Sequence, residues 1–214
     1  FIMKILAIES SVKESSIAIM DNGDCYQLFS DNKNDTAKSL PILVEDALNK
    51  TKNSFNNLDG IAISMGPGSF TGLRVGLSYA KGLSLALDIP IIPISTFDSM
   101  INIAKPNLSN IVNTIIYSHS NFVYNAEYKL KDNLYISSME PRLVDIKDIQ
   151  FKENSFVIYV GKEEIINTIN IENINNIILN ASSIATLGNN NYDSLKTKSL
   201  DNLSPNYIGS FNLG

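Results

Sequence analysis

Three closely spaced glycines, Gly66, Gly68 and Gly72, separate a strand-like run from a helix-like run in ISMGPGSFTGLRVGLSYAKGL. A glycine-rich turn before a helix exposes backbone amides that can hold a phosphate or another anion. The spacing does not fit a P-loop, because no lysine follows Gly72, and the third glycine comes one residue too late for a dinucleotide fingerprint. Two interpretations remain for the loop: a weak anion site at Gly68 and Ser69, or a device for close packing.

Few other residues could carry chemistry. Glu9 ends the first strand-like run, and it is either the remnant of a metal or nucleotide site or an acid bonded to loop amides. His119 is the only histidine, which argues against a metal site built on paired His or Cys ligands. No nucleophile with a triad partner is readable near His119, so we interpret it as a surface histidine on a hairpin. Cys25, the single cysteine, is expected to be a small buried hydrophobe.

The composition narrows the function further. The 214 residues include 22 acidic and 17 basic side chains, for a net charge of −5. An acidic surface repels polyphosphate, so a tight nucleic-acid binder acting alone is unexpected. One cysteine fits a reducing compartment, no apolar run is long enough to span a bilayer, and the opening FIMKILAIES has a strand pattern rather than that of a signal peptide. These features predict a cytoplasmic protein with no membrane contact. For a metal they leave only an all-oxygen site open, and we assign no catalytic residue, metal ligand or cofactor to the chain itself.

In the first half of the chain, segments with the apolar spacing of strands alternate with segments with the apolar spacing of helices. Short apolar runs predict strands, a hairpin surrounds Asn22-Gly23, and apolar residues at three- and four-residue spacing predict helices. In chain order, the expected elements are a strand at 3–11, a hairpin at 16–31, a helix within 37–55, a strand at 58–65, a helix to about 87, a strand at 89–96 and a helix that ends before Pro106.

The second half repeats this order in topology but not in sequence. Three strand-like runs at 110–118, 121–130 and 133–139 precede a weak helix at 143–151, a strand at 155–161, a helix at 162–169, a strand at 174–180 and a helix at 181–189. Two such copies predict an α/β, actin-like (ASKHA) fold of two ribonuclease-H-like lobes with mixed sheets flanked by helices. We place an N-terminal lobe at 3–105 and a smaller C-terminal lobe at 106–214.

The helix after the glycine loop carries two stripes. Small residues recur every four positions, and a neighbouring stripe is apolar; the two sets are Gly72, Gly76, Ala80 and Ser84, and Val75, Tyr79, Leu83 and Leu87. Each interior glycine costs about 1 kcal/mol against alanine, which close approach of another backbone would offset. Packing on the helix's own sheet uses one stripe, so two stripes favour a second helix, from this chain or another. Arg74 lies in the first turn, where the helix dipole disfavours a cation, and we expect it to meet a carboxylate or phosphate.

These residues resemble a known family. ILAIESS, LPILVEDAL and above all DGIAISMGPGSFTGLRVGLSYAKGLSLALDIPIIPISTFDSM are similar to segments of the bacterial TsaB (YeaZ) family, over nearly half of the chain. Beyond residue 100 the likeness is reduced to FVYNAEY and SPNYI. The chain departs from the family pattern in three places: at Glu9-Ser10-Ser11, where Asp-Thr-Ser is usual; at Asp35, where histidine is common; and at Tyr117-Ser118-His119, where Asp-Ala-Arg is common.

The resemblance implies a function. TsaB-like proteins are noncatalytic partners of TsaD in placing a threonylcarbamoyl group on the adenosine beside the tRNA anticodon, and TsaE is an ATPase of the same complex. TsaD holds a metal with a histidine pair, which this chain cannot supply. The resemblance thus implies binding of a TsaD-type transferase and a TsaE-type ATPase, tRNA contact only through the complex, homodimer formation when alone, and ATP or ADP only at the complex interface.

We therefore expect the two first-lobe helices to form the partner interface. The residues assigned to it are Leu40, Leu43, Val44, Ala47, Gly72, Leu73, Arg74, Gly76, Leu77 and Ala80. The Gly66–Gly72 loop would set the angle of the second helix, and aspartate at Gly76 should abolish association while leaving the fold largely intact. Two alternatives remain open: an independent actin-like ATPase or phosphotransferase, and a homodimeric structural protein.

Overall fold

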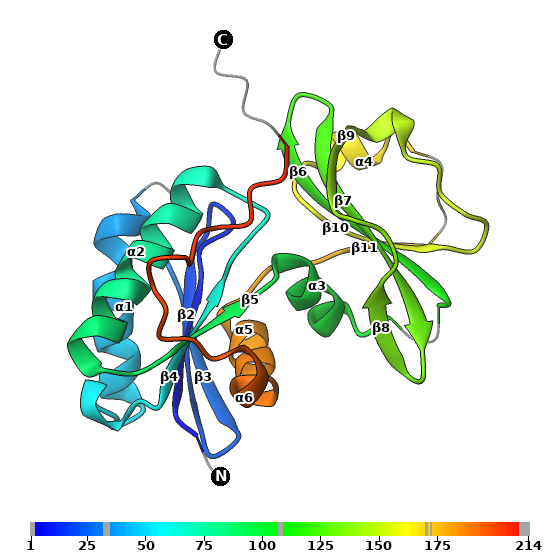
Figure 1. Cartoon of the computed structure of the whole chain (residues 1–214). Helices are drawn as coiled ribbons and strands as arrows, with labels where there is room; N and C mark the ends of the chain where they lie inside the picture. The colour runs from blue at the N-terminus through cyan, green and yellow to red at the C-terminus, as the bar shows by residue number, and fades with distance from the viewer. Residues whose placement is uncertain (1–2, 32–34, 107–108, 170, 172, 210–214) are drawn as a thin grey trace. The chain divides into compact units, whose positions relative to one another are not determined.

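The structure, a computed structural model, describes residues 3–31, 35–106, 109–169, 171 and 173–209 (Figure 1). The chain forms two compact units. Unit 1 comprises residues 1–99 and 179–206, and unit 2 comprises residues 100–178 and 207–214. Within the described residues, no helix combines the length and the apolar character needed to cross a bilayer.

Unit 1 is built on a five-stranded mixed sheet. Its order is β3 (Asp24–Phe29), β2 (Ser16–Asp21), β1 (Ile5–Glu9), β4 (Gly60–Ser64) and β5 (Ile91–Ile94). The first three strands form an antiparallel meander, whereas β4 and β5 run parallel to β1. The predicted hairpin is confirmed, since Asn22 and Gly23 both take positive φ in the β2–β3 turn.

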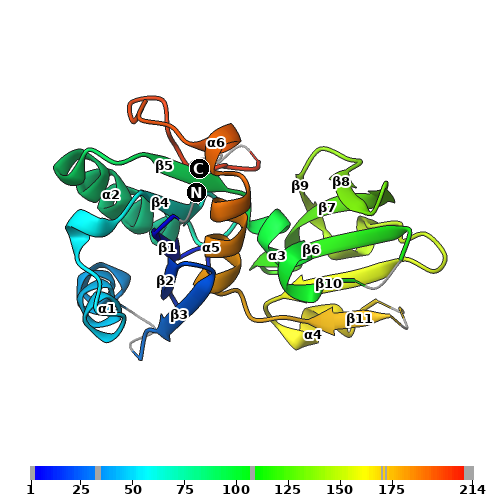
Figure 2. The ribbon, with the colours of Figure 1, turned by 90° about the horizontal axis from the view of Figure 1, so that it is seen from below.

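Helices cover both faces of this sheet (Figure 2). One face packs against α1 (Thr36–Lys50) and α2 (Phe70–Leu87), and the other packs against α5 (Ala181–Asn190). Strand alternation divides the core accordingly, because Leu6 and Ile8 face α1 and α2 while Ile5 and Ala7 face α5. Two short helices, η1 (Phe55–Asn57) and α6 (Tyr192–Leu195), complete the unit.

Unit 2 repeats the strand order of unit 1. Its sheet contains β11 (Ile174–Asn176), β10 (Phe156–Val160), β6 (Ile111–His119), β7 (Phe122–Lys131) and β8 (Leu134–Ser137), with β9 (Arg142–Asp145) paired to β7. The first three strands are again an antiparallel meander and the next two are parallel to β6. The shared order confirms the predicted fold of two ribonuclease-H-like lobes. The remaining elements are α3 (Thr96–Ala104), through which the chain enters the unit, η2 (Ile146–Asp148) and α4 (Glu163–Ile166).

Two sequence predictions about this architecture are wrong. The weak helix at 143–151 is instead β9 followed by the single turn η2. The division into 3–105 and 106–214 also fails, because residues 179–206 return to unit 1. There the backbone N–H of Ala181 donates to Ser16 Oγ at 2.9 Å, and Ser99 Oγ lies 3.0 Å from Ser183 Oγ. A helix covers whichever sheet buries its apolar face, and the local pattern of α5 does not say which sheet that is.

Candidate functional site

The glycine loop between β4 and α2 is filled by this chain's own backbone. The N–H of Ser69 donates to the carbonyl oxygen of Ser11 at 2.6 Å. A Cβ on Gly68 would lie less than 3.0 Å from that same oxygen, and one on Gly72 would lie as close to the carbonyl oxygen of Ser10. Glycine is therefore needed for close approach between the loop and the end of β1. Of the two interpretations left open by the sequence, this geometry favours the packing device.

The loop also fixes the start of α2. Ser69 is the N-cap residue, and its Oγ accepts a hydrogen bond from the N–H of Gly72 at 3.2 Å. Such a cap satisfies one of the amides that a helix start leaves without an intrahelical partner. Gly66 contributes the turn itself, with a φ of +99°. Together these contacts hold the first turn of α2 against the carboxyl end of β1.

The small stripe of α2 packs on its own sheet. A Cβ on Gly76 would lie less than 3.0 Å from Ser10 Oγ and 3.5 Å from Ile63 Cδ1. Gly72, Ala80 and Ser84 of the same stripe are buried as well. The interpretation that a partner helix fills this stripe is therefore wrong, because the β1 end and β4 already occupy it. The expectation that aspartate at Gly76 would leave the fold intact fails for the same reason.

The neighbouring apolar stripe of α2 meets α1. Val75, Tyr79, Leu83 and Leu87 are partly buried against the core cluster that includes Leu40 and Val44 of α1. Burial raises the pKa of the Tyr79 phenol, and the Glu45 carboxylate on α1 raises it further. The second helix that the two stripes predict is thus α1 of this same chain.

Most of the ten residues assigned to a partner interface are buried within unit 1. Eight are buried in unit 1, and these are Leu40, Val44, Ala47, Gly72, Leu73, Gly76, Leu77 and Ala80. Leu43 is half-buried, and only Arg74 is exposed. The Arg74 guanidinium lies over the Phe70 ring, 3.7 Å from its centroid, in a cation–π contact one helical turn away. The buried eight build the two helices' shared core rather than an outer surface.

A different set of residues faces outward from the same helices. Ile42 on α1 is 60% exposed and Leu85 on α2 is 74% exposed. The exposed side of α2 also carries three small residues at four-residue spacing, which are Ser78, Gly82 and Ala86. Nothing lies within 4 Å of a Cβ placed on Gly82. We call this set (Ile42, Ser78, Gly82, Leu85 and Ala86) the outer helix face. The sequence does not single out this face, because the buried stripe shows the same small-residue spacing more strongly.

Glu9 is completely buried at the end of β1. Its Oε1 accepts hydrogen bonds from the N–H of Ser11 at 2.7 Å, Ser11 Oγ at 2.6 Å and Ser64 Oγ at 2.9 Å. Its Oε2 has no hydrogen-bond partner among the described residues. Burial raises the pKa of this carboxyl, and the hydrogen bonds from Ser11 and Ser64 oppose that rise. This geometry matches the strand-end acid bonded to a loop amide.

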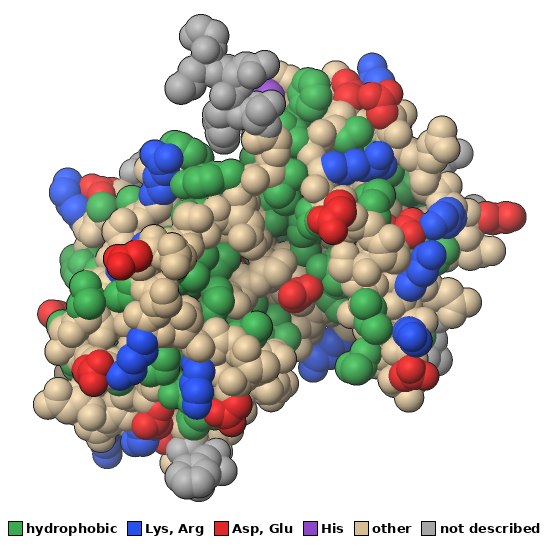
Figure 3. Space-filling model, viewed as in Figure 1, with side chains coloured by type: hydrophobic (Ala, Val, Ile, Leu, Met, Phe, Trp, Pro, Cys, Tyr) green, Lys and Arg blue, Asp and Glu red, His purple; other side chains and the backbone are tan. Residues whose placement is uncertain are grey.

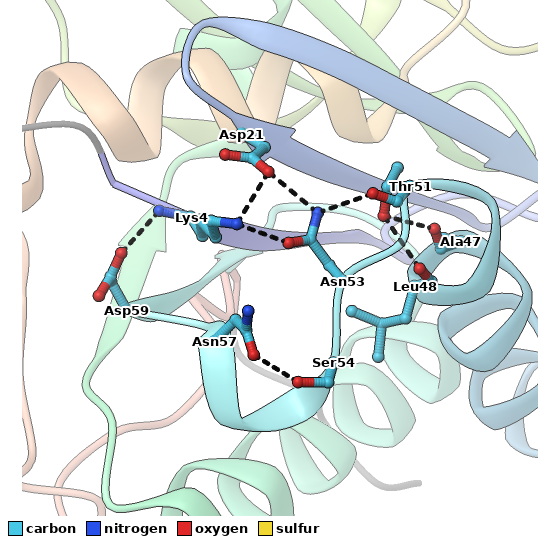
Figure 4. Close-up of polar contacts among 9 residues, drawn as sticks. All are labelled: Lys4, Asp21, Ala47, Leu48, Thr51, Asn53, Ser54, Asn57 and Asp59. Atoms are coloured by element: carbon cyan, nitrogen blue, oxygen red, sulfur yellow. Dashed lines mark hydrogen bonds and ion pairs between the residues drawn. The ribbon is translucent and has the colours of Figure 1, made fainter.

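A polar cluster ties the far end of α1 to the sheet (Figure 4). Lys4 Nζ donates to Asn53 Oδ1 at 2.8 Å and lies 3.0 Å from Asp21 Oδ2, while Asn53 Nδ2 donates to Asp21 Oδ2 at 3.1 Å. The hydrogen bond from Lys4, followed by that from Asn53, lowers the pKa of the Asp21 carboxyl. Because Asn53 follows the end of α1, this Lys4–Asp21–Asn53 cluster fixes α1 relative to β1 and β2.

The remaining sequence candidates lie apart from the helices. His119 is exposed at the β6–β7 turn as expected, with Nδ1 3.0 Å from Ser118 Oγ and its ring stacked on Phe122 at 5.3 Å between centroids. Cys25 is exposed on the edge strand β3, so its expected burial is wrong. In the part of the chain that the structure describes, no three His, Cys, Asp or Glu side chains form a group able to hold a metal.

Comparison with known proteins identifies the family. The model of the family described as "TsaD: tRNA N6-adenosine threonylcarbamoyltransferase" matches residues 32–168. A protein of Buchnera aphidicola (subspecies Acyrthosiphon pisum) named "tRNA threonylcarbamoyladenosine biosynthesis protein TsaB" is 32% identical over 177 residues, covering 79% of this chain and 80% of its own length. The chain belongs to the TsaB (YeaZ) family. The Escherichia coli TsaB protein is also 32% identical, over 61% of this chain and 57% of its own length.

A solved structure shares the fold of this TsaB-family chain. YeaZ from Pseudomonas aeruginosa superposes with a TM-score of 0.84, covering 96% of this chain and all of that one, at 18% sequence identity. At that identity the likeness establishes the fold alone. The likeness in architecture therefore extends over unit 2 as well as unit 1.

Proposed function

We propose that this chain takes part in tRNA threonylcarbamoyladenosine biosynthesis as a noncatalytic scaffold that binds and activates a TsaD-type transferase. A TsaE-type ATPase would join the same complex, and tRNA would be reached only through it. Any ATP or ADP would bind at the complex interface, and the chain would pair with itself when TsaD is absent. Membership of the TsaB family supports the pathway, and the single histidine leaves the metal chemistry to the transferase.

The outer helix face carries this proposal. It combines two strongly exposed aliphatic side chains, Ile42 and Leu85, with a glycine at which another backbone can approach closely. Single exposed aliphatic side chains are ordinary on a soluble protein, so Ile42 and Leu85 support the proposal only together with the family membership. The buried stripe below it serves a different purpose, which is to hold α2 in place through Ser10 and Ser11.

The test is co-purification with the TsaD-type transferase of the same organism. Leu85→Asp and Gly82→Arg should each abolish the complex, because the first puts a charge in an apolar contact and the second fills the space that a partner backbone needs. Both positions are exposed, so neither isolated variant should unfold at a lower temperature than the unchanged chain.

Leu195→Asp is the matched control, since Leu195 is a 40% exposed leucine on α6 of the same unit. It should leave co-purification unchanged. Retention of the transferase by both Leu85→Asp and Gly82→Arg would contradict the proposed interface. Mg-ATP binding and turnover by the isolated chain, measured by calorimetry and phosphate release, would favour the independent ATPase instead.

A further inference from the structure

The tip of the β7–β8 hairpin in unit 2 exposes apolar side chains on an edge strand. Leu134 is 67% exposed and Ile136 is 51% exposed. β8 ends the strand order of the sheet, so its outer edge is unpaired among the described strands. Natural edge strands usually carry charge or proline that discourages contact with other chains. Here the edge strand carries two aliphatic side chains instead.

Register places two lysines beside these side chains. Lys131 pairs with Leu134 and Lys129 with Ile136 across the antiparallel ladder, so all four side chains lie on one face of the hairpin. Both lysines are exposed, and Asp132 lies in the turn between them and the aliphatic pair. The acid next to Lys129 on the same face of β7 is Glu127, which forms an ion pair with Lys152 Nζ at 2.8 Å. Figure 3 shows hydrophobic, basic and acidic side chains side by side over the β8 end of unit 2.

The opposite face of the hairpin is anchored. Tyr135 points away from Leu134 and Ile136, and its hydroxyl donates to the carbonyl oxygens of Pro106 at 2.7 Å and Ser109 at 3.0 Å. Asp132 and Asn133 take positive φ, which is the conformation of a tight two-residue hairpin turn. The hairpin therefore cannot turn its aliphatic side chains inward without breaking these contacts.

We propose that this hairpin face (Lys129, Lys131, Leu134 and Ile136) docks an acidic, apolar segment of a different protein. Leu134 and Ile136 supply the apolar contact with the partner segment. Lys129 and Lys131, at the border of that contact, attract the carboxylates of the segment. A second copy of this chain is disfavoured as the occupant. A two-fold contact would bring the same patch of each copy together, and with it four lysines.

Binding of labelled peptides by fluorescence anisotropy tests the proposal on the full chain. The first peptide alternates leucine and glutamate, and the second alternates leucine and lysine. The unchanged chain should bind the first and not the second, and amide NMR shifts should map to β7 and β8. Leu134→Ser with Ile136→Ser should weaken binding about tenfold or more, as for residues at the centre of an interface. Lys129→Glu with Lys131→Glu should reverse the peptide preference.

Two substitutions elsewhere in the chain serve as controls. Lys147→Glu replaces an exposed lysine of η2 in unit 2, and Leu195→Ser replaces an exposed leucine of unit 1; both should bind the acidic peptide normally. Equal binding of the two peptides, or equal loss in a control, overturns the proposal. So does lysine-dependent binding of tRNA or phosphatidylserine vesicles at this face, or self-association that Leu134→Ser removes. The outer helix face is untouched by these variants, so co-purification with the transferase reports separately on the proposed scaffold function.

Discussion

Ser10 Oγ lies where any residue larger than glycine at position 76 of α2 would place its Cβ. This contact joins the end of β1 to the second turn of α2, and it lies beside the two loop contacts made by the Ser10 and Ser11 carbonyl oxygens. Helix α2 is therefore positioned by backbone and hydroxyl groups at distances that only glycine allows. The orientation of the outer helix face follows from these contacts.

Alanine at Gly76 and at Gly82 should have opposite effects on stability. Gly76→Ala places a methyl group against Ser10 and should lower the free energy of unfolding by about 1–3 kcal/mol through overpacking. Gly82→Ala enters open space in the same helix and should raise it by about 0.5–1 kcal/mol through helix propensity. Urea unfolding followed by circular dichroism measures both. Equal changes at the two positions would contradict the packing described for Gly76.

The buried Glu9 should make stability fall as pH rises. Its pKa is raised in the folded chain by burial, so the folded state retains a proton that the unfolded state has lost above a pH of about 4.5. Stability should decline from there until the pH passes the raised folded pKa, and then stay level. Glu9→Gln keeps an oxygen acceptor for Ser11 and Ser64 and cannot ionise. Its unfolding free energy, measured by urea titration at a series of pH values, should lack this decline; an unchanged slope would refute the assignment to Glu9.

The Lys4–Asp21–Asn53 cluster should act in the opposite direction. Hydrogen bonds from Lys4 and Asn53 lower the pKa of Asp21 below its usual 3.8, so the stability that they contribute is present above that value and is lost as pH falls through the folded pKa. Lys4 and Asp21 are 28% and 25% exposed, which limits their coupling to about 0.5–1 kcal/mol. A double-mutant cycle of Lys4→Met and Asp21→Asn at pH 7 measures this coupling. A cycle that closes at zero would show that the Lys4–Asp21 ion pair contributes no stability.

Local pattern predicted most elements of the fold, because each depends on neighbours in the sequence. The β2–β3 hairpin follows from Asn22-Gly23, and α1 and α2 follow from apolar spacing. The destination of α5 could not be predicted, since its apolar face fits either sheet and the deciding contact, Ala181 to Ser16, spans 165 residues. Similarly, the pattern 143–151 has helical spacing, but pairing with β7 extends its first part as β9.

The candidate site was predicted less well than the fold. The four-residue spacing of small residues predicts that another element approaches α2 closely, but it does not say on which side. Gly76, which packs against Ser10, and Gly82, which faces solvent, both belong to stripes with this spacing. The sequence also gave no sign that Leu134 and Ile136 would remain exposed, since their alternation is typical of a half-buried strand. Deciding which face is buried requires the tertiary packing that only the structure supplies.

Residues 179–206 should be required for unit 1 to fold. They place α5 over the face of the sheet formed by Ile5, Ala7, Ala62 and Ile92, all of which are completely buried in the whole chain. A fragment of residues 3–105 would expose this apolar face and should not unfold cooperatively. Joining residue 99 to residue 179 by a flexible Gly/Ser linker should restore cooperative thermal unfolding, because the Ser99–Ser183 and Ala181–Ser16 contacts can form again. If the 3–105 fragment instead unfolds as cooperatively as the linked chain, with the same dispersion of amide NMR signals, the N-terminal lobe is self-sufficient and the division into these two units is wrong.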